Sequence, residues 1–111
     1  MKTSFRDEGS VRIFIIEGDI DLGNSGELRK TLFDALPGVS RLVLNLRAIR
    51  YIDSSGIATL IELLKECQRR KTELALFALS PAVHDVFKLT HVIKIFQVYG
   101  TEEQAIQGAQ A

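Results

Sequence analysis

The sequence predicts an α/β fold built on a largely parallel sheet. Apolar runs of strand length alternate with amphipathic segments of helix length along the whole chain. The connections between them are short, and no linker, internal repeat or low-complexity stretch interrupts the pattern. Alternation of this kind places crossover helices on a parallel sheet. A length of 111 residues fits one domain.

The first element is a strand at residues 11–17, where β-branched and aromatic side chains alternate on both sides. We expect this strand to be covered on both faces. A short preceding strand around Phe5 would pair with it through a turn at residues 7–10, which makes the sheet mixed. Residues 18–26 are rich in turn-forming residues and predict a loop. Asn24 or Ser25 then caps a helix that ends at Pro37 and Gly38.

The middle of the chain repeats the pattern. Residues 42–46 predict a second buried strand, and the apolar spacing of residues 57–70 predicts a helix with one apolar face. The segment between them is interpreted as a short connection. Residues 74–79 predict a third buried strand, followed by a short helix with Ser80 as cap and Pro81 at its first position.

Residues 93–99 predict a further strand, and Thr101 with Gln104 forms a capping box for a last helix. The tail at residues 107–111 is expected to fray.

Composition excludes several classes of protein. Apolar residues make up 46% and charged residues 25%, which is typical of a globular protein. Fourteen basic and fourteen acidic residues cancel, so no overall field favours nucleic acid or an anionic membrane. The first residues lack the apolar core of a signal peptide and no run is long enough to span a bilayer, so we expect a cytoplasmic protein. The single cysteine, Cys67, excludes an internal disulfide and is expected to be a small buried hydrophobe.

The most informative segment is Asp53-Ser54-Ser55-Gly56, which lies between a strand and a helix. A helix start presents unpaired N–H groups and the positive end of the helix dipole, so a hydroxyl there is well placed to carry a phosphate. Taken alone, the four residues are more typical of an ordinary helix cap, in which Asp or Ser caps the helix and Gly allows the turn.

Other polar residues point to weaker hypotheses. Asp19 and Asp21 could bind a metal or act as an acid/base pair, although two loop carboxylates that cap turns are the simpler interpretation. His84 and His91 lack the clustered ligands of a zinc site. A triad of Ser55, His84 and Asp53 lacks the Gly-x-Ser-x-Gly elbow and room for a substrate pocket. No nucleotide-binding pattern occurs either. We therefore expect no catalytic residue, metal or cofactor, and a kinase substrate rather than an enzyme.

Five segments, in this order and spacing, resemble the STAS domain of bacterial anti-sigma factor antagonists. The resemblance runs from about Val11 to the last helix and implies a single STAS domain over residues 1–111, with a mixed sheet of four to five strands and about four helices. The segments are Gly18-Asp19-Ile20-Asp21, Leu42-Val43-Leu44-Asn45-Leu46, Tyr51-Ile52-Asp53-Ser54-Ser55-Gly56-Ile57, Leu79-Ser80-Pro81-Ala82-Val83 and Phe87-Lys88-Leu89-Thr90.

The resemblance also implies a function. Ser55 would be phosphorylated by an ATP-dependent anti-sigma factor that is also a serine kinase, and a PP2C-type phosphatase would remove the phosphate. The unphosphorylated form would bind the anti-sigma factor and release its sigma factor. Ser54 would serve in local capping or hydrogen bonding. The implied partner-binding residues are Asp19, Asp21, Asp53, Ser54, Ser55, Gly56 and Ile57.

No direct contact with nucleic acid or membrane is implied, and the protein would be a monomer or a weak dimer. Two other roles stay open, a subunit of a transporter-associated complex and a stressosome-type scaffold. Serine rather than threonine at position 55 favours the antagonist over the scaffold. Ala58 and His91 stand where the family often has glycine, which bears on the details of the partner.

Overall fold

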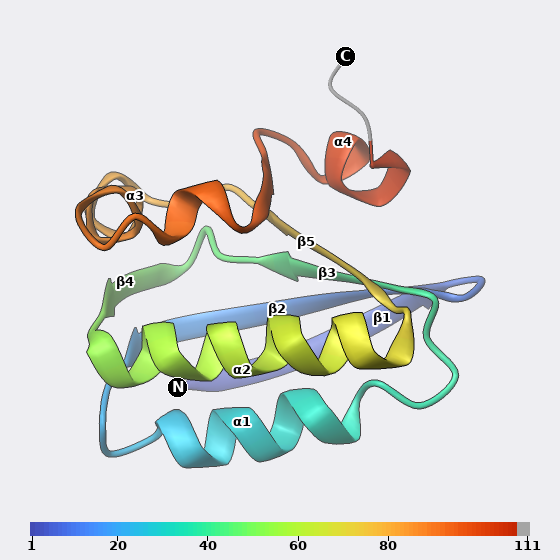
Figure 1. Cartoon of the computed structure of the whole chain (residues 1–111), viewed down its shortest axis with the longest axis horizontal. Coiled ribbons are helices and arrows are strands. Elements are labelled where there is room, and N and C mark those ends of the chain that lie inside the picture. The colour runs from blue at the N-terminus through green and yellow to red at the C-terminus, as the bar shows by residue number, and fades with distance from the viewer. Residues whose placement is uncertain (109–111) are drawn as a thin grey trace.

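A mixed sheet lies at the centre of the computed structural model, which describes residues 1–108 (Figure 1). The order of its main path is β1 (Lys2–Glu8), β2 (Val11–Ile20), β3 (Arg41–Asn45), β5 (Glu73–Phe77) and β6 (Gln97–Tyr99). A further strand, β4 (Ile49–Ile52), pairs with β2 beyond the end of β3. Only β1 runs antiparallel to its neighbour. The α/β class and the mixed sheet are confirmed, with six strands in the described part instead of four to five.

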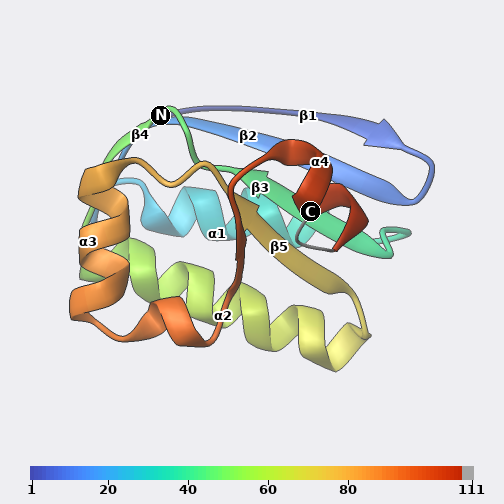
Figure 2. The same ribbon diagram turned by 90° about the horizontal axis from the view of Figure 1, so that it is seen from above.

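Helices cover both faces of the sheet (Figures 1 and 2). The larger core lies between the sheet and α1 (Ser25–Asp34), α2 (Ser54–Arg70) and α3 (Pro81–Leu89), followed by a 3-10 turn, η1 (Val92–Lys94). A smaller cluster on the other face includes Ala105 of α4 (Glu102–Gln107). None of the helices within residues 1–108 is long and apolar enough to cross a membrane.

Side chains of β2 enter both cores, as its sequence predicts. Phe14 and Ile16 belong to the larger cluster, and Ile13 belongs to the smaller one. Cys67 of α2 is buried in the larger core, where desolvation raises the pKa of its thiol to about 11. The thiol therefore stays protonated at neutral pH, which confirms the expected small hydrophobe.

The predicted loop at residues 18–26 starts too early, because β2 continues through Gly18 to Ile20. Those residues pair with β4, which was predicted as part of a connection. The strand predicted over residues 93–99 is also wrong in its first half. His91 has a left-handed φ of 62°, which starts the η1 turn and leaves only Gln97–Tyr99 in the sheet.

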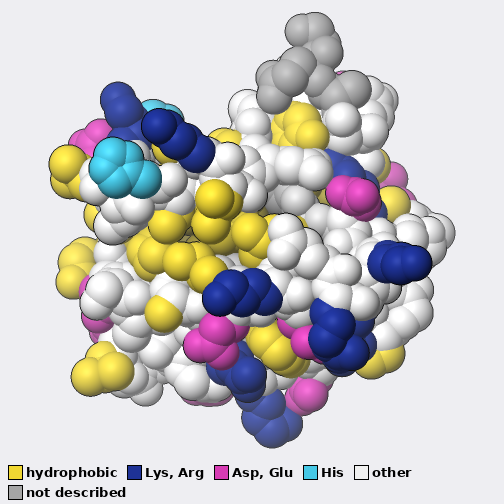
Figure 3. Space-filling model, viewed as in Figure 1, with side chains coloured by type: hydrophobic (Ala, Val, Ile, Leu, Met, Phe, Trp, Pro, Cys, Tyr) yellow, Lys and Arg dark blue, Asp and Glu magenta, His cyan; other side chains and the backbone are white. Residues whose placement is uncertain are grey.

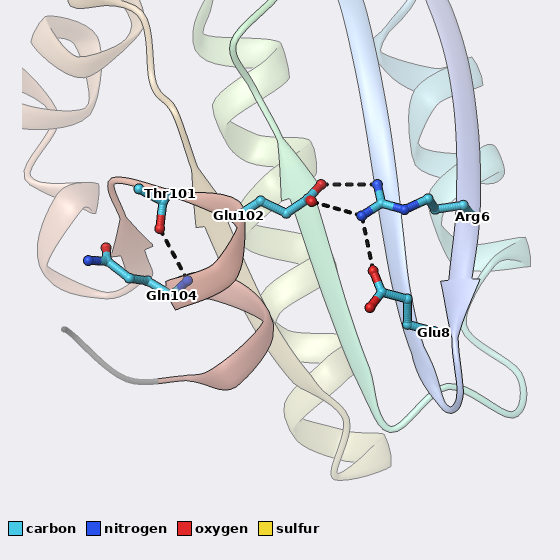
Figure 4. Close-up of polar contacts among 5 residues, drawn as sticks. All are labelled: Arg6, Glu8, Thr101, Glu102 and Gln104. Carbon is cyan, nitrogen blue, oxygen red and sulfur yellow. Dashed lines mark hydrogen bonds and ion pairs between the residues drawn. The ribbon is translucent and has the colours of Figure 1, made fainter.

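The start of α4 is held by a cap and by an ion pair to β1 (Figure 4). Thr101 accepts a hydrogen bond from the Gln104 N–H at 3.2 Å, while the Gln104 side chain accepts from Gly100 rather than from Thr101. One half of the predicted capping box is therefore present, and the returning bond from the Gln104 side chain goes to the N–H of Gly100, one residue before Thr101. Arg6 donates to both carboxylate oxygens of Glu102 at 3.0 and 2.8 Å, which lowers the Glu102 pKa and joins the last helix to the first strand. Of the tail expected to fray, Gln107 ends α4 and Gly108 caps it, whereas residues 109–111 lie outside the described residues.

Candidate functional site

The carboxyl ends of β2 and β4 meet at one edge of the sheet. Ile20 and Ile52 are paired at the last position of the two parallel strands, and the Asp53 N–H donates to the Ile20 carbonyl at 3.1 Å. The loop after β2 and the start of α2 therefore lie side by side, as expected for segments that follow parallel strands. This edge holds all the polar residues that the sequence singled out as partner-binding.

Asp53 caps α2 and holds Ser55. One oxygen, Oδ1, accepts from the backbone N–H groups of Ser55 and Gly56 at 2.9 and 3.2 Å. The same oxygen accepts from the Ser55 hydroxyl at 2.5 Å. The Ser55 hydroxyl makes the largest contribution and lowers the Asp53 pKa, while desolvation raises it by a smaller amount. The backbone N–H groups of Gly56, Ser55 and Leu22 lower this pKa further. A charged carboxylate thus orients a half-buried hydroxyl at a helix N-terminus.

This lowered pKa predicts how stability depends on pH. The contribution of the Asp53 charge is full above its ordinary pKa of about 3.9 and is lost as pH falls through the lower folded value. Asp53→Asn keeps an oxygen acceptor but has no charge. We expect wild type to exceed this variant in unfolding free energy at neutral pH, with a difference that shrinks under acid conditions. Urea denaturation across this pH range measures it, and a difference independent of pH would contradict the assignment.

Ser54 does not have the expected capping role. Its side chain is exposed and makes no hydrogen bond to the rest of residues 1–108, because Asp53 supplies the cap. The two adjacent hydroxyls therefore differ: Ser55 is oriented, whereas Ser54 is free to rotate.

Asp21 organises the loop after β2. Its Oδ1 accepts from the Gly23 N–H at 2.9 Å, and its own N–H donates to the Asn24 side chain at 3.0 Å. Asn24 also donates to the Asp19 carbonyl at 2.8 Å, so its side chain holds the loop instead of capping α1. The simpler interpretation of Asp21, a carboxylate that caps a turn, is confirmed.

Asp19 lies 3.5 Å from Arg50 in an exposed ion pair. No group of three His, Cys, Asp or Glu side chains gathers as a metal site anywhere in the described chain. The Ser55 hydroxyl bonds Asp53 directly, and no hydrogen bond of the described residues joins it to His84. The structure therefore does not assemble the Ser-His-Asp triad.

Gly56 and Ile57 lie beneath the surface that Asp53, Ser54 and Ser55 form. A Cβ on Gly56 would lie 2.6 Å from a side-chain carbon of Ile52 and 2.7 Å from one of Ile20. The start of α2 therefore sits directly on the ends of β2 and β4, and both residues position the site from below.

We expect Gly56→Ala to lower the unfolding free energy by about 1–3 kcal/mol, because two core side chains must move aside. Gly26→Ala, in α1, is the matched control, since a Cβ added at this position would meet nothing within 4 Å. That change should stabilise α1 by about 0.5–1 kcal/mol through helix propensity. Urea denaturation of both variants measures the difference, and equal stabilities would contradict the close packing of Gly56.

Two exposed apolar side chains flank the site and were missed as site residues. Leu22, in the loop after β2, is 81% exposed, and Tyr51, in β4, is 52% exposed. A leucine among the polar residues of the loop was the signal that pointed to the first. The exposure of Tyr51 depends on the pairing of β4, which the sequence did not predict.

Comparisons with known proteins give one consistent picture. The sequence model of the STAS domain matches residues 3–105. An anti-sigma-B factor antagonist of Listeria monocytogenes is 27% identical over 99 residues, which cover 87% of this chain and 85% of that protein.

Two solved structures have the same fold. An anti-sigma factor antagonist from Mycobacterium paratuberculosis has a TM-score of 0.87 at 22% identity, covering 99% of this chain and 94% of that one. The Bacillus cell fate determinant SpoIIAA in its phosphorylated form has a TM-score of 0.72 at 19% identity, covering 96% of this chain and 98% of that one.

Proposed function

The chain belongs to the STAS domain family, and from this premise we propose that it is an anti-sigma factor antagonist controlled by phosphorylation at Ser55. The unphosphorylated form binds a cognate anti-sigma factor that is also a serine kinase, and the bound anti-sigma factor releases its sigma factor. Phosphate on Ser55 ends this binding, and a PP2C-type phosphatase restores it. The names of the relatives support the role, and a related fold solved in a phosphorylated form supports the modification.

The observation that carries this proposal is the hydrogen bond from the Ser55 hydroxyl to Asp53 at the start of α2. Phosphoryl transfer depends mainly on positioning and on stabilising charge, so an oriented oxygen is the main requirement on the acceptor side. The Ser55 oxygen attacks the γ-phosphorus of ATP held by the partner. The bond between that phosphorus and the oxygen of ADP breaks, ADP leaves, and the hydroxyl proton is released to solvent. Asp53 orients the oxygen, and the chain itself acts as substrate and binding module rather than as an enzyme.

The proposed binding surface combines charge with two apolar anchors. Asp19, Asp21 and Asp53 place carboxylates along the edge of the sheet, and Leu22 and Tyr51 lie exposed beside them. Exposed aromatic and aliphatic side chains beside polar groups are typical centres of binding energy in protein interfaces. The partner surface is expected to carry a pocket for these side chains and a complementary positive charge.

Incubation with candidate anti-sigma factor kinases and ATP tests the proposal, with the phosphate located by mass spectrometry. We expect one phosphate per chain, on Ser55, and its removal by a PP2C-type phosphatase. A transporter-associated subunit would instead copurify with a membrane complex without phosphoserine, and a scaffold would elute as a large assembly. Kinases that modify their own antagonists but leave this chain unmodified would contradict the proposal.

Asp21→Asn tests the loop side of the surface. Asparagine retains an oxygen that accepts from the Gly23 N–H, so the melting temperature should stay nearly unchanged while the charge is lost. Asp21→Ala would remove the turn contact as well. We expect about tenfold weaker partner binding for Asp21→Asn, equal to about 1.4 kcal/mol. Asp85→Asn, on the exposed side of α3, is the matched control and should bind normally in titration calorimetry. Full affinity of the Asp21→Asn variant would exclude this loop from the interface.

A further inference from the structure

The outer edge of β1 is unpaired within the described chain. β1 pairs with β2 on one side, and no other described strand continues the sheet beyond it. All seven of its residues are exposed. A free edge of this length presents a row of unpaired backbone N–H and C=O groups, which is a template for another strand.

The side chains of β1 divide between the two faces of the sheet. Phe5 lies opposite Phe14 of β2, and their rings stack with centroids 6.1 Å apart on the face that α1 covers. Arg6 points to the opposite face, where it reaches Glu102 of α4 (Figure 4). Because side chains alternate along a strand, Thr3 and Asp7 share the face of Phe5, whereas Lys2 and Glu8 share the face of Arg6.

We propose that β1 is the interface of a homodimer, in which the β1 strands of two copies pair antiparallel about a two-fold axis at Phe5. This pairing places Lys2 of each copy opposite Glu8 of the second copy, on the same face of the joined sheet. The two Phe5 side chains face each other at the centre. The remaining pairs are Ser4 with Arg6 and Thr3 with Asp7.

The charges of β1 favour this register over its neighbours. A two-fold pairing centred on Ser4 would place Lys2 opposite Arg6 of the second copy, and one centred on Arg6 would place the two Arg6 side chains opposite each other. Like charges directly opposite each other destabilise a strand pair, whereas opposite charges stabilise it. The register centred on Phe5 has two Lys–Glu pairs and no like pair, and it alone engages all seven residues.

Charged residues on an edge strand usually prevent association. On β1 their order makes the strand complementary to a second copy of itself in the register centred on Phe5.

An open groove beside β1 supplies an apolar contact for the second copy. The groove has a volume of about 420 Å³ and lies between β1 and α1, with Phe14 and Ala35 among its lining residues. Phe5 also lines it and is 53% exposed, with the Arg12 guanidinium 4.2 Å from its ring centre. In the proposed pairing, Phe5 of the second copy lies against the open side of this groove.

The dimer is compatible with partner binding at the Ser55 site but does not depend on it. Asp21, Asp53 and Ser55 all lie outside β1, and the antiparallel arrangement places the two sites at opposite ends of the joined sheet. A seven-residue strand pair buries less area than the ~1,200 Å² of a standard stable interface. The dimer is therefore weak, and its population depends on protein concentration.

Sedimentation equilibrium over a range of concentrations tests the proposal with a pair of charge reversals. Lys2→Glu places two glutamates opposite each other at both ends of the interface, and Glu8→Lys places two lysines there. Each variant alone should raise the dimer dissociation constant at least about tenfold at low salt. An equal mixture of the two variants should form a heterodimer, because every Glu then faces a Lys of the other chain. The double variant should likewise recover the wild-type dimer.

Lys94→Glu is the control, since Lys94 is exposed, lies in η1 rather than in β1, and has no acidic partner among residues 1–108. It makes the same charge change and should dimerise like wild type. Lys2 also faces Glu17 of its own chain, and Glu8 accepts a hydrogen bond from Arg6 of its own chain at 3.0 Å. Circular dichroism therefore checks that both single variants are folded. A wild type that stays monomeric at every concentration would overturn the proposal. So would a dimer that ignores both reversals, or a mixture that does not recover association.

Discussion

Ser55→Ala is expected to abolish phosphate incorporation by the cognate kinase, whereas Ser54→Ala should be phosphorylated at close to the normal rate. The two hydroxyls are neighbours in one turn, but only that of Ser55 is oriented by a hydrogen bond to Asp53. Ser54 is the more exposed of the two and has no such bond. Exposure alone would therefore favour Ser54, and positioning favours Ser55. Because misplacement of a reacting atom by about 1 Å can cost a hundredfold in rate, positioning should decide.

Intact-mass measurement after incubation with kinase and ATP gives the number of phosphates, and peptide fragmentation gives the residue. Circular dichroism of both alanine variants controls for folding, which neither change should disturb at these surface positions. A Ser55→Ala protein that gains phosphate as fast as wild type, together with a Ser54→Ala protein that does not, would reverse the assignment.

Long periodic segments of the fold could be predicted from the sequence, and short ones could not. Residues 11–17 and the helix from Ile57 to Arg70 carry enough apolar residues for their period to identify them. β4 has only four residues, of which Arg50 and Tyr51 are exposed, so no apolar pattern marks it as a strand. The error at residues 93–96 has a backbone cause, because a left-handed residue such as His91 redirects a chain whose side chains favour a strand.

The place of the candidate site could also be predicted, but not the role of each side chain in it. A strand followed by Asp53-Ser54-Ser55-Gly56 and a helix identifies a hydroxyl at a helix start. Which residue caps the helix depends on side-chain rotation, and Asp53 rather than Ser54 has that role. The exposed Tyr51 beside the site could not be foreseen without β4, since a long-range strand pairing sets its position.

Phosphate on Ser55 is expected to weaken binding of the anti-sigma factor about a hundredfold without refolding the domain. The group adds a charge of about −1.5 to −2 within the turn that already holds the Asp53 carboxylate. The helix dipole offsets only about 0.3–1 kcal/mol of their repulsion, but Ser55 is partly open to water, which screens the rest. Few apolar contacts depend on the Ser55 side chain, so the free domain should keep its fold.

The complex is affected far more than the free domain, because binding removes the phosphate from water. Burying an anion without a partner charge costs several kcal/mol, and about 3 kcal/mol already corresponds to a hundredfold loss of affinity. Titration calorimetry of the phosphorylated and unphosphorylated forms measures this loss, and circular dichroism with thermal melting compares their folds. Equal affinities would exclude a switch at Ser55, and a changed fold in the phosphorylated form would replace an electrostatic switch by a conformational one.

A pair of glutamate variants separates the position of the charge from its presence. Ser55→Glu and Ser54→Glu add the same charge to adjacent residues of one turn, one half-buried beside Asp53 and one exposed. A glutamate at position 55 cannot keep the hydroxyl bond to Asp53, and its carboxylate lies within the surface that the partner covers. We therefore expect Ser55→Glu to bind the partner more weakly than wild type does. The loss should be smaller than that caused by phosphorylation, because glutamate carries one charge and fewer acceptor oxygens. Ser54→Glu can turn its side chain to solvent and should retain most of the binding. A larger loss for Ser54→Glu would place the centre of the interface at Ser54.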